Sequence, residues 1–261
     1  MKIGLLYICT GRYNHFFSDF YTSCEKYFLP EYEKEYFVFS DDEKLTEMSN
    51  VKLIKKECLG FPLDSLFHFD FFLQLKTEIE KCDYIFYFNS NIQFLKKVGT
   101  DFLPTDEEGY LIGEEWPAWI GKNPMYFPYE RRKQSLAYIE PHKPPYHYFM
   151  GGIIGGRSKE FIEMSHDLAR NIREDFDRGI IARVHDESHV NRYFRDHKCK
   201  ILPPEFSMPE EWIKNQDVYS ILRNKALLSN TFDIEKGRNN SLVKRMIKYI
   251  KKQITALKWY L

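Results

Sequence analysis

Apolar and polar positions alternate along the first half of the chain in blocks that predict strands and helices. The runs "KIGLLYIC", "EYFVFS" and "VKLIKK" predict three strands, at residues 2–9, 35–40 and 51–56. Between the first two, apolar residues recur every three or four positions over residues 14–28, which predicts a helix. A strand followed by a helix and another strand is the start of a parallel α/β unit.

The same spacing predicts one long amphipathic helix over residues 63–81, followed by a strand at residues 84–88. The continuous apolar run of that strand is typical of a parallel strand buried on both faces. The second half combines expected glycine-rich turns in "GGIIGG", residues 151–156, with helices over residues 158–173 and 186–196. The predicted fold class is α/β, with an open, mostly parallel sheet that binds ligands beyond the carboxyl ends of its strands.

Composition narrows the class of protein. The 261 residues are enough for one sizeable domain, and 43% hydrophobic with 29% charged residues is typical of a soluble globular protein. Five cysteines without a CxxC pair indicate neither a disulfide framework nor a zinc site, which suits a reducing cytosol. The first apolar run is too short for a signal peptide, and no run reaches the roughly 18 residues of a spanning helix. We expect no nucleic-acid partner.

The last 21 residues differ from the rest in charge. Residues 241–261 contain six Lys or Arg and no acid, so they carry +6 while residues 1–240 carry −6. Apolar residues share one face of this predicted helix, which is typical of a helix that lies on an anionic membrane. Each basic residue contributes about 1 kcal/mol there. We therefore expect a catalytic domain over residues 1–240 and a tail that attaches a cytoplasmic protein to the inner membrane. The alternative is a terminal helix docked on its own domain.

Two segments carry candidate chemistry at element ends. The strand at residues 84–88 runs into Asn89-Ser90-Asn91, which taken alone is better explained as a plain strand-to-loop turn. "RVHDESHVNRY", residues 183–193, has His185 and His189 around two acids, and lacks the HExxH order of a zinc site. An acidic first helical turn, favoured by the macrodipole, explains the acids without a function.

Two further motifs allow more than one interpretation. "YERRKQSLAYI", residues 129–139, places three cations in a row, either as a solvated charged loop or as ligands for an anion. "YHYFMGGIIGG", residues 146–156, has two glycine pairs, which fit tight turns or a backbone that must approach a ligand closely. It lacks the order of a dinucleotide fingerprint.

Together and in this order, these motifs resemble glycosyltransferase family 6, which contains the histo-blood-group A and B transferases and the α1,3-galactosyltransferases. The resemblance covers about residues 3–223. It implies a GT-A fold, with nucleotide binding in about residues 1–95 and acceptor binding and catalysis in about residues 96–225. It also implies retaining transfer of galactose or N-acetylgalactosamine from a UDP-sugar to the 3-hydroxyl of a galactoside.

The resemblance implies a role for each matched position. Glu187 matches the catalytic glutamate, whose carboxylate stabilises or attacks the oxocarbenium-like sugar as UDP leaves. Gly152 matches a position where a small residue leaves room for an acetamido group, which favours UDP-N-acetylgalactosamine. The implied acceptor-binding positions are Trp116, Tyr129, Val184 and Glu187. The implied donor-binding positions are Ile8, Cys9, Thr10, Tyr13, His68, Asn89, Ser90, Asn91, Arg131, Met150, Gly151, Gly152, His185, Asp186, Arg223 and Lys225.

The chain also departs from the family pattern. His68 stands where an arginine is usual, Trp116 where a histidine is, and Val184 where a tryptophan is often found, so the acceptor and part of donor binding differ. Animal members have a membrane-anchored stem and an Asp-x-Asp that binds manganese. This chain has neither and resembles the shorter bacterial members with Asn-x-Asn, some of which work without metal.

We therefore expect no metal cofactor. Neutral amides lack the charge that attracts a dication, and at about 4 Å and an effective dielectric of about 20 each missing charge pair is worth up to about 4 kcal/mol. Cations must then hold the diphosphate directly. The candidates are Arg131, Arg132, Arg223 and Lys225.

The expected function is a metal-independent α1,3-N-acetylgalactosaminyltransferase that builds a bacterial surface glycan on a fucosylated galactoside similar to blood-group structures. The alternatives are the same reaction with UDP-galactose, a catalytically silent carbohydrate-binding protein, and a metal-dependent hydrolase built on the histidines.

Overall fold

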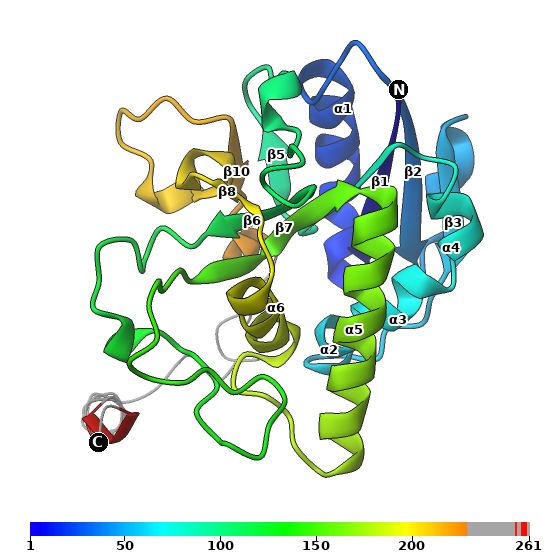
Figure 1. Cartoon of the computed structure of the whole chain (residues 1–261). Coiled ribbons are helices and arrows are strands. Elements are labelled where there is room, and N and C mark those ends of the chain that lie inside the picture. The colour runs from blue at the N-terminus through cyan, green and yellow to red at the C-terminus, as the bar shows by residue number, and fades with distance from the viewer. Residues whose placement is uncertain (229–253, 255–256, 260–261) are drawn as a thin grey trace.

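The computed structural model describes residues 1–228, 254 and 257–259, apart from the side chains of residues 46, 47, 227 and 228. Its centre is a seven-stranded sheet in the order β3-β2-β1-β4-β7-β6-β8 (Figure 1). The strands are β1 Lys2–Cys9, β2 Glu33–Ser40, β3 Val51–Lys55, β4 Tyr84–Phe88, β6 Leu111–Glu115, β7 Phe149–Arg157 and β8 Lys200–Leu202. β1 pairs in parallel with β2 and β4, β2 with β3, and β6 with β8, whereas β7 is antiparallel to β4 and β6. The predicted α/β class, with a mostly parallel sheet, is confirmed.

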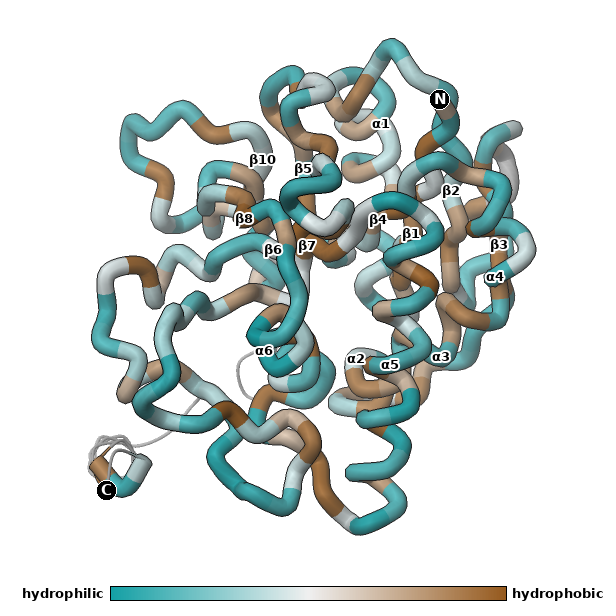
Figure 2. The backbone as a smooth tube through the Cα atoms, viewed as in Figure 1, coloured by the Kyte–Doolittle hydropathy of each residue, from teal (hydrophilic) through white to brown (hydrophobic). Residues whose placement is uncertain are grey.

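Helices cover both faces of the sheet, and the alternation of side chains along β1 shows why. Leu5 and Tyr7 point into a core cluster with α1 Phe17–Tyr27, while Leu6 points into a second cluster with α3 and α5. The other α-helices are α2 Leu63–Leu66, α3 His68–Leu73, α4 Lys76–Ile79, α5 Ser158–Asp177 and α6 His185–Asp196. In Figure 2, hydrophilic residues occur on the loops and also along the helices, where they alternate with hydrophobic ones. The sheet is therefore buried on both faces, as its apolar strands predict.

A small second sheet brings the end of the described chain back to the central one. β10 Ser220–Leu222 pairs antiparallel with β5 Ile92–Phe94 and parallel with β9 Met208–Pro209. This pairing places residues 223–226 beside the loop that follows β4. The 3-10 helices are η1 Gly11–Phe16, η2 Glu43–Glu47, η3 Thr100–Phe102, η4 Pro124–Tyr126, η5 Pro204–Phe206, η6 Glu210–Trp212 and η7 Lys225–Leu228.

Two predictions about local structure are wrong. The expected helix over residues 63–81 is broken into α2, α3 and α4. Its apolar residues occur on every side of a regular helix, and the breaks at Phe67 and Leu75 let them all reach the core. The expected glycine-rich turns at residues 151–156 are instead part of strand β7. A Cβ on Gly155 would lie 2.4 Å from the carbonyl oxygen of Ile85, so the strands pack too closely for a side chain there.

The predicted membrane-binding tail lies largely outside the described residues. Within the described part, Trp259 is 6% exposed, and its indole Nε1 donates a hydrogen bond to the carbonyl of Ile139 at 2.9 Å. Its ring packs against Tyr129 and Tyr146. At this residue the tail contacts its own domain, as in the alternative interpretation. No helix among the described residues is long and apolar enough to cross a membrane.

Candidate active site

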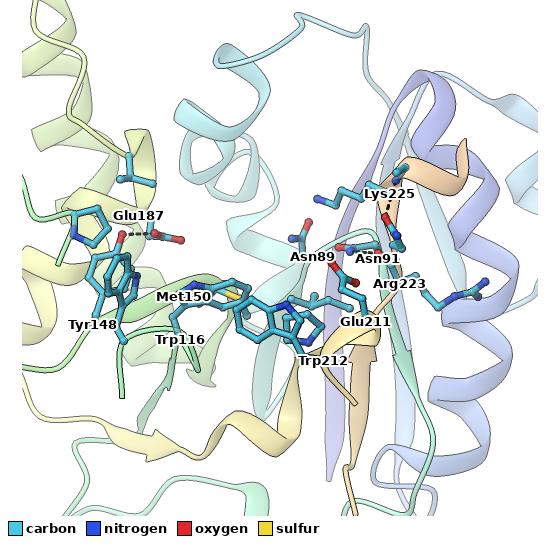
Figure 3. Close-up of a pocket in the computed structure, with 17 residues that line it drawn as sticks. Asn89, Asn91, Trp116, Tyr148, Met150, Glu187, Glu211, Trp212, Arg223 and Lys225 are labelled. Atoms are coloured by element: carbon cyan, nitrogen blue, oxygen red, sulfur yellow. Dashed lines mark hydrogen bonds between the residues drawn. The ribbon is translucent and has the colours of Figure 1, made fainter. Parts of the chain in front are cut away.

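An open pocket of about 660 Å³ lies at the carboxyl end of β4, where β7 begins (Figure 3). The segment after β4 forms one wall together with the segment after β10, and the start of α6 forms the opposite wall. This is the edge at which α/β sheets bind ligands. The pocket is lined by Asn89, Asn91, Trp116, Trp119, Pro128, Tyr148, Met150, Val184, Glu187, Pro209, Glu211, Trp212, Leu222, Arg223, Asn224, Lys225 and Ala226.

Backbone and amide hydrogen bonds fix the Asn-Ser-Asn segment. The backbone N–H of Asn89 donates to the carbonyl of Gly152 at 2.8 Å, and the hydroxyl of Tyr7 donates to the carbonyl of Ser90 at 2.5 Å. The Asn91 side-chain N–H donates to the carbonyl of Arg223 at 2.7 Å, and the Arg223 backbone N–H donates back to the carbonyl of Asn91 at 2.7 Å. Both asparagines line the pocket, and Asn91 also holds the segment after β10 in place.

The two basic residues of that segment point in different directions. The Arg223 guanidinium donates to Asp19 and to Gln93, both at 2.9 Å, and points away from the pocket (Figure 3). The Lys225 ammonium lies 5.2 Å from the ring centroid of Tyr13 and extends along the Asn89 side of the pocket. Lys225 is therefore the cation best placed to meet an anionic ligand.

Glu187 lies on the opposite wall, in the first turn of α6. Its Oε1 accepts a hydrogen bond from the hydroxyl of Tyr148, and its Oε2 accepts one from the backbone N–H of Gly151 at 2.9 Å. Burial raises the pKa of Glu187, and the two hydrogen bonds oppose that rise. The carboxylate is thus fixed at the pocket wall with its pKa above the usual range, an arrangement common among functional groups.

Asp186 and His68 lie together behind that wall. His68 is 1% exposed, and its Nδ1 lies 3.9 Å from Asp186 Oδ2. Burial lowers the pKa of His68 to about 3, so the imidazole is neutral. Burial also raises the pKa of Asp186, with a further contribution from the charge of Glu187. A Cβ on Gly151 would lie 3.2 Å from Asp186 Oδ2, so the glycine permits this close approach.

The structure brings together some of the sequence-predicted positions and not others. The predicted positions that line the pocket are Asn89, Asn91, Trp116, Met150, Val184, Glu187, Arg223 and Lys225. Tyr13, Gly151 and Gly152 each lie next to one of those residues, and Asp186 directly precedes Glu187 in the chain. Ile8, Cys9, Thr10, His68, Ser90 and His185 are not lining residues. Cys9 is buried in the core, and the His185 ring packs against Phe61.

The structure places the "YERR" residues away from the pocket, contrary to the expectation that their cations face the diphosphate. Arg131 donates to the carbonyls of Met125 and Phe127 at 2.6 and 3.1 Å. Arg132 pairs with the buried carboxylate of Glu130 at 2.7 Å, because a buried charge requires a partner. The ring of Tyr129, expected at the acceptor, is buried behind Tyr148.

Tyr148, Trp212 and Glu211 are among the pocket residues that no sequence pattern indicates. Tyr148 reaches Glu187 only because β7 and α6 lie side by side. Trp212 is 44% exposed, and its ring centroid lies 5.9 Å from that of Trp116. Glu211 lies next to it in the same short 3-10 helix. Among the described residues, no three His, Cys, Asp or Glu side chains gather into a group that could hold a metal ion.

Comparison with known proteins agrees with this geometry. The model of glycosyltransferase family 6 matches residues 70–234. The O-antigen biosynthesis glycosyltransferase WbnI of Escherichia coli is 34% identical over 228 residues, which are 86% of this chain and 95% of that protein. The chain is also similar to longer animal proteins. Globoside alpha-1,3-N-acetylgalactosaminyltransferase 1 of Gallus gallus is 25% identical over 85% of this chain and 66% of that protein. Histo-blood group ABO system transferase 2 of Rattus norvegicus is 26% identical over 87% of this chain and 70% of that protein. The chain belongs to glycosyltransferase family 6.

Proposed function

We propose that the protein transfers N-acetylgalactosamine from UDP-N-acetylgalactosamine to the 3-hydroxyl of a galactoside, with retention of the α configuration and without a divalent metal. The observation that carries this proposal is Glu187, fixed by two hydrogen bonds on one wall of a pocket whose other wall carries Lys225 and Asn89. A donor that spans the pocket places its diphosphate near the cation and its sugar near the carboxylate.

The proposed chemistry uses both walls. The bond between the anomeric carbon and the diphosphate oxygen breaks, and its electron pair leaves with UDP. A new bond forms to the acceptor oxygen, whose proton passes to the departing diphosphate. Positive charge develops on the sugar ring meanwhile, and the Glu187 carboxylate stabilises it or attacks it covalently. Either role requires Glu187 to be ionised.

The floor of the pocket supports a donor with an acetamido group. A Cβ on Gly152 would lie 2.8 Å from Met150 Cε and 3.5 Å from Asn89 Cβ, so any side chain there displaces Met150. The glycine thus lets Met150 lie against the strand, and we propose that this keeps the methionine out of the space for a bulky 2-substituent. UDP-galactose, which carries a hydroxyl there, is the second candidate donor, because its smaller group also fits. We expect the purified protein to use UDP-N-acetylgalactosamine at least tenfold better than UDP-galactose, and equal use of both donors contradicts the assignment.

Metal-independence is supported by the chemistry of Asn89 and Asn91. Both side chains are neutral, so they bring no negative charge to attract a divalent cation. Lys225 and amide N–H groups then neutralise the leaving diphosphate. We expect full activity in EDTA, and a requirement for added manganese contradicts this part of the proposal.

The relatives support a surface glycan as the product, because the E. coli relative is named for O-antigen biosynthesis. The proposed acceptor is therefore a fucosylated galactoside on a growing bacterial glycan. Trp116 and Trp212 offer aromatic faces for its sugars. A screen of galactosides with and without fucose, measured by UDP release, tests the acceptor. A catalytically silent carbohydrate-binding protein would release no UDP with any donor.

We also propose that the basic tail holds the protein at the cytoplasmic side of the inner membrane. Six Lys or Arg without any acid support this. Truncation after Asn240 is expected to abolish binding to anionic vesicles. It also removes Trp259 from its site on Ile139, so a lower melting temperature is expected too. Vesicle binding that survives the truncation contradicts the membrane role, whatever happens to stability.

A further inference from the structure

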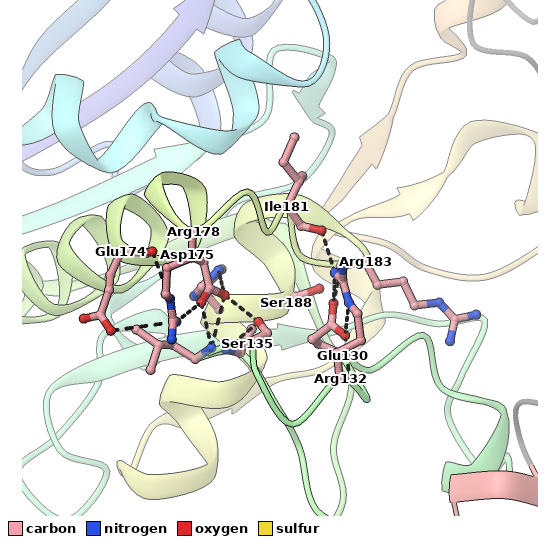
Figure 4. A network of polar contacts seen from close by, with 12 residues as sticks. Glu130, Arg132, Ser135, Glu174, Asp175, Arg178, Ile181, Arg183 and Ser188 are labelled. Carbon is pink, nitrogen blue, oxygen red and sulfur yellow. Dashed lines mark hydrogen bonds and ion pairs between the residues drawn. The ribbon is translucent and has the colours of Figure 1, made fainter.

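A buried carboxylate outside the pocket organises the "YERR" segment. Glu130 is 2% exposed, and its Oε1 accepts hydrogen bonds from the backbone N–H groups of Arg131 and Arg132 at 2.9 and 2.8 Å and from Arg132 Nε at 2.9 Å. Its Oε2 accepts from Arg132 Nη2 at 2.7 Å and from the backbone N–H of Arg183 at 2.8 Å (Figure 4). Both oxygens are thus fully used within the protein.

The Glu130–Arg132 pair holds the segment that leads into α6. Arg132 Nη2 donates to the carbonyl of Ile181 at 2.6 Å, while Glu130 accepts from the N–H of Arg183. The pair therefore binds the backbone on both sides of Ala182. Ala182 lies five residues before Glu187 in the chain. Within this interval the backbone changes direction abruptly, because His185 has a φ of 48°. A shift of residue 183 would therefore displace the first turn of α6, which carries Glu187.

A second buried carboxylate ties the other end of the same loop to α5 and α6. Asp175 is 1% exposed and accepts hydrogen bonds from the Ser135 hydroxyl at 2.5 Å, from the Leu136 N–H at 3.0 Å and from Arg178 at 2.5 Å. The His189 Nε2 of α6 lies 3.6 Å from the same carboxylate. The loop is thus anchored at two points that both precede Glu187 in the chain, Asp175 in α5 and the segment of residues 181–183.

We propose that Glu130 and Arg132 are positioning residues, which set the place of the Glu187 carboxylate in the pocket without touching the substrate. This inference deepens the proposed function and rests on it. It also explains why the "YERR" segment, which does not line the pocket, carries a charged pair. Displacement of a catalytic group by about 1 Å costs on the order of 100-fold in rate. Donor binding through Lys225 and Asn89, on the opposite wall, is left intact.

The test compares this pair with a matched pair elsewhere. Glu130→Gln, Arg132→Lys and Arg132→Met are measured beside Glu160→Gln and Arg157→Lys. Arg157 and Glu160 form a similar two-point ion pair at the opposite end of α5 from Asp175, about 22 Å away along the helix. For each variant, kcat, UDP affinity by calorimetry and melting temperature are determined.

We expect kcat to fall about 10- to 100-fold in Glu130→Gln and Arg132→Met, with UDP affinity within about twofold of the wild type. Arg132→Lys should be intermediate, because an ammonium keeps the charge and loses the bidentate geometry. The control variants should keep wild-type kcat. A purely structural role would lower the melting temperature without lowering the kcat of the folded fraction.

Two outcomes overturn the inference: folded Glu130 and Arg132 variants with kcat within about threefold of the controls, or equal losses in kcat and UDP affinity. If Glu130→Gln does not fold, Arg132→Lys and Arg132→Met decide by the same criteria. Glu187→Gln separates this inference from the proposed function. Full activity in Glu187→Gln refutes the proposed function, whereas an inactive Glu187→Gln beside fully active Glu130 variants refutes only the positioning role.

Discussion

Glu187 and Glu130 are two glutamates of one active-site region with opposite environments. Glu187 is at the pocket wall with two hydrogen-bond donors, and burial raises its pKa. Glu130 is closed off from solvent with five donor contacts. Burial alone would raise its pKa too, but the bonds from Arg132 and Arg183 outweigh burial and lower the pKa below the ordinary 4.5.

The difference indicates that Glu187 is available to react with a substrate, whereas Glu130 stabilises the fold around it. A carboxylate with every lone pair occupied is stable as an anion and has nothing left for a substrate. A carboxylate with two donors and one face on a pocket retains capacity to meet a developing positive charge. The following variants test whether the two glutamates differ in this way.

The largest effect is expected for Glu187→Gln. The amide keeps the shape but not the negative charge that stabilises the developing oxocarbenium character, so kcat should fall by about 10²- to 10³-fold or more. UDP affinity should remain near that of the wild type, because Lys225 and Asn89 are untouched. Calorimetry with UDP is the control for a folded donor site. Unchanged kcat would remove the distinction between the two glutamates.

Tyr148→Phe should have the next largest effect. It removes one of the two hydrogen bonds to Glu187, which is worth about 1.5–3 kcal/mol for a charged acceptor, so kcat should fall about 10- to 100-fold. That bond also lowers the pKa of Glu187, so its loss must raise the pKa further. The acid limb of the pH–activity profile should therefore move to higher pH. A limb that stays in place or moves to lower pH would show that Glu187 does not titrate there.

Gly152→Ala should change donor preference by about tenfold. The added Cβ would lie 2.8 Å from Met150 Cε, which must move into the space beside the donor sugar. UDP-N-acetylgalactosamine should lose more activity than UDP-galactose. The ratio of kcat/KM for the two donors on one preparation cancels any loss of folded protein. A constant ratio would assign donor selection to another residue.

Glu130→Gln should have a smaller effect. It should lower the free energy of unfolding near pH 7 by about 1–3 kcal/mol. Because the folded-state pKa of Glu130 lies below 4.5, its stabilisation is present above pH 4.5 and is lost as the pH falls through the folded-state value. Denaturant titrations at several pH values should show the variant less stable than the wild type near pH 7 and the two converging in acid. A constant difference across this range would mean that the Glu130 charge contributes nothing.

The sequence predicted the parts of the site that depend on local pattern. Periodicity predicts an apolar strand that ends at Asn89 and a helix whose first turn contains Glu187. The family resemblance assigns both positions to one active site. The pocket then follows from the rule that ligands bind at the carboxyl ends of strands.

Parts that depend on long-range packing could not be predicted. The aromatic residues of 63–81 fit a helical period locally, but the need to bury all of them breaks the helix at Phe67 and Leu75. The sequence predicts that the cations of "YERR" face the phosphate, because nothing local shows that Glu130 is buried among them. Tyr148 and Trp212 reach the pocket only through the pairing of distant elements.

The most direct test of the central claim is proton NMR of the product formed from UDP-N-acetylgalactosamine and a fucosylated galactoside in EDTA, with wild-type protein and Glu187→Gln. The wild type is predicted to give an α-linked N-acetylgalactosamine on the 3-hydroxyl of galactose, while Glu187→Gln gives at least 100-fold less in the same time. A β-linked product, or equal amounts of product from both proteins, would contradict the account.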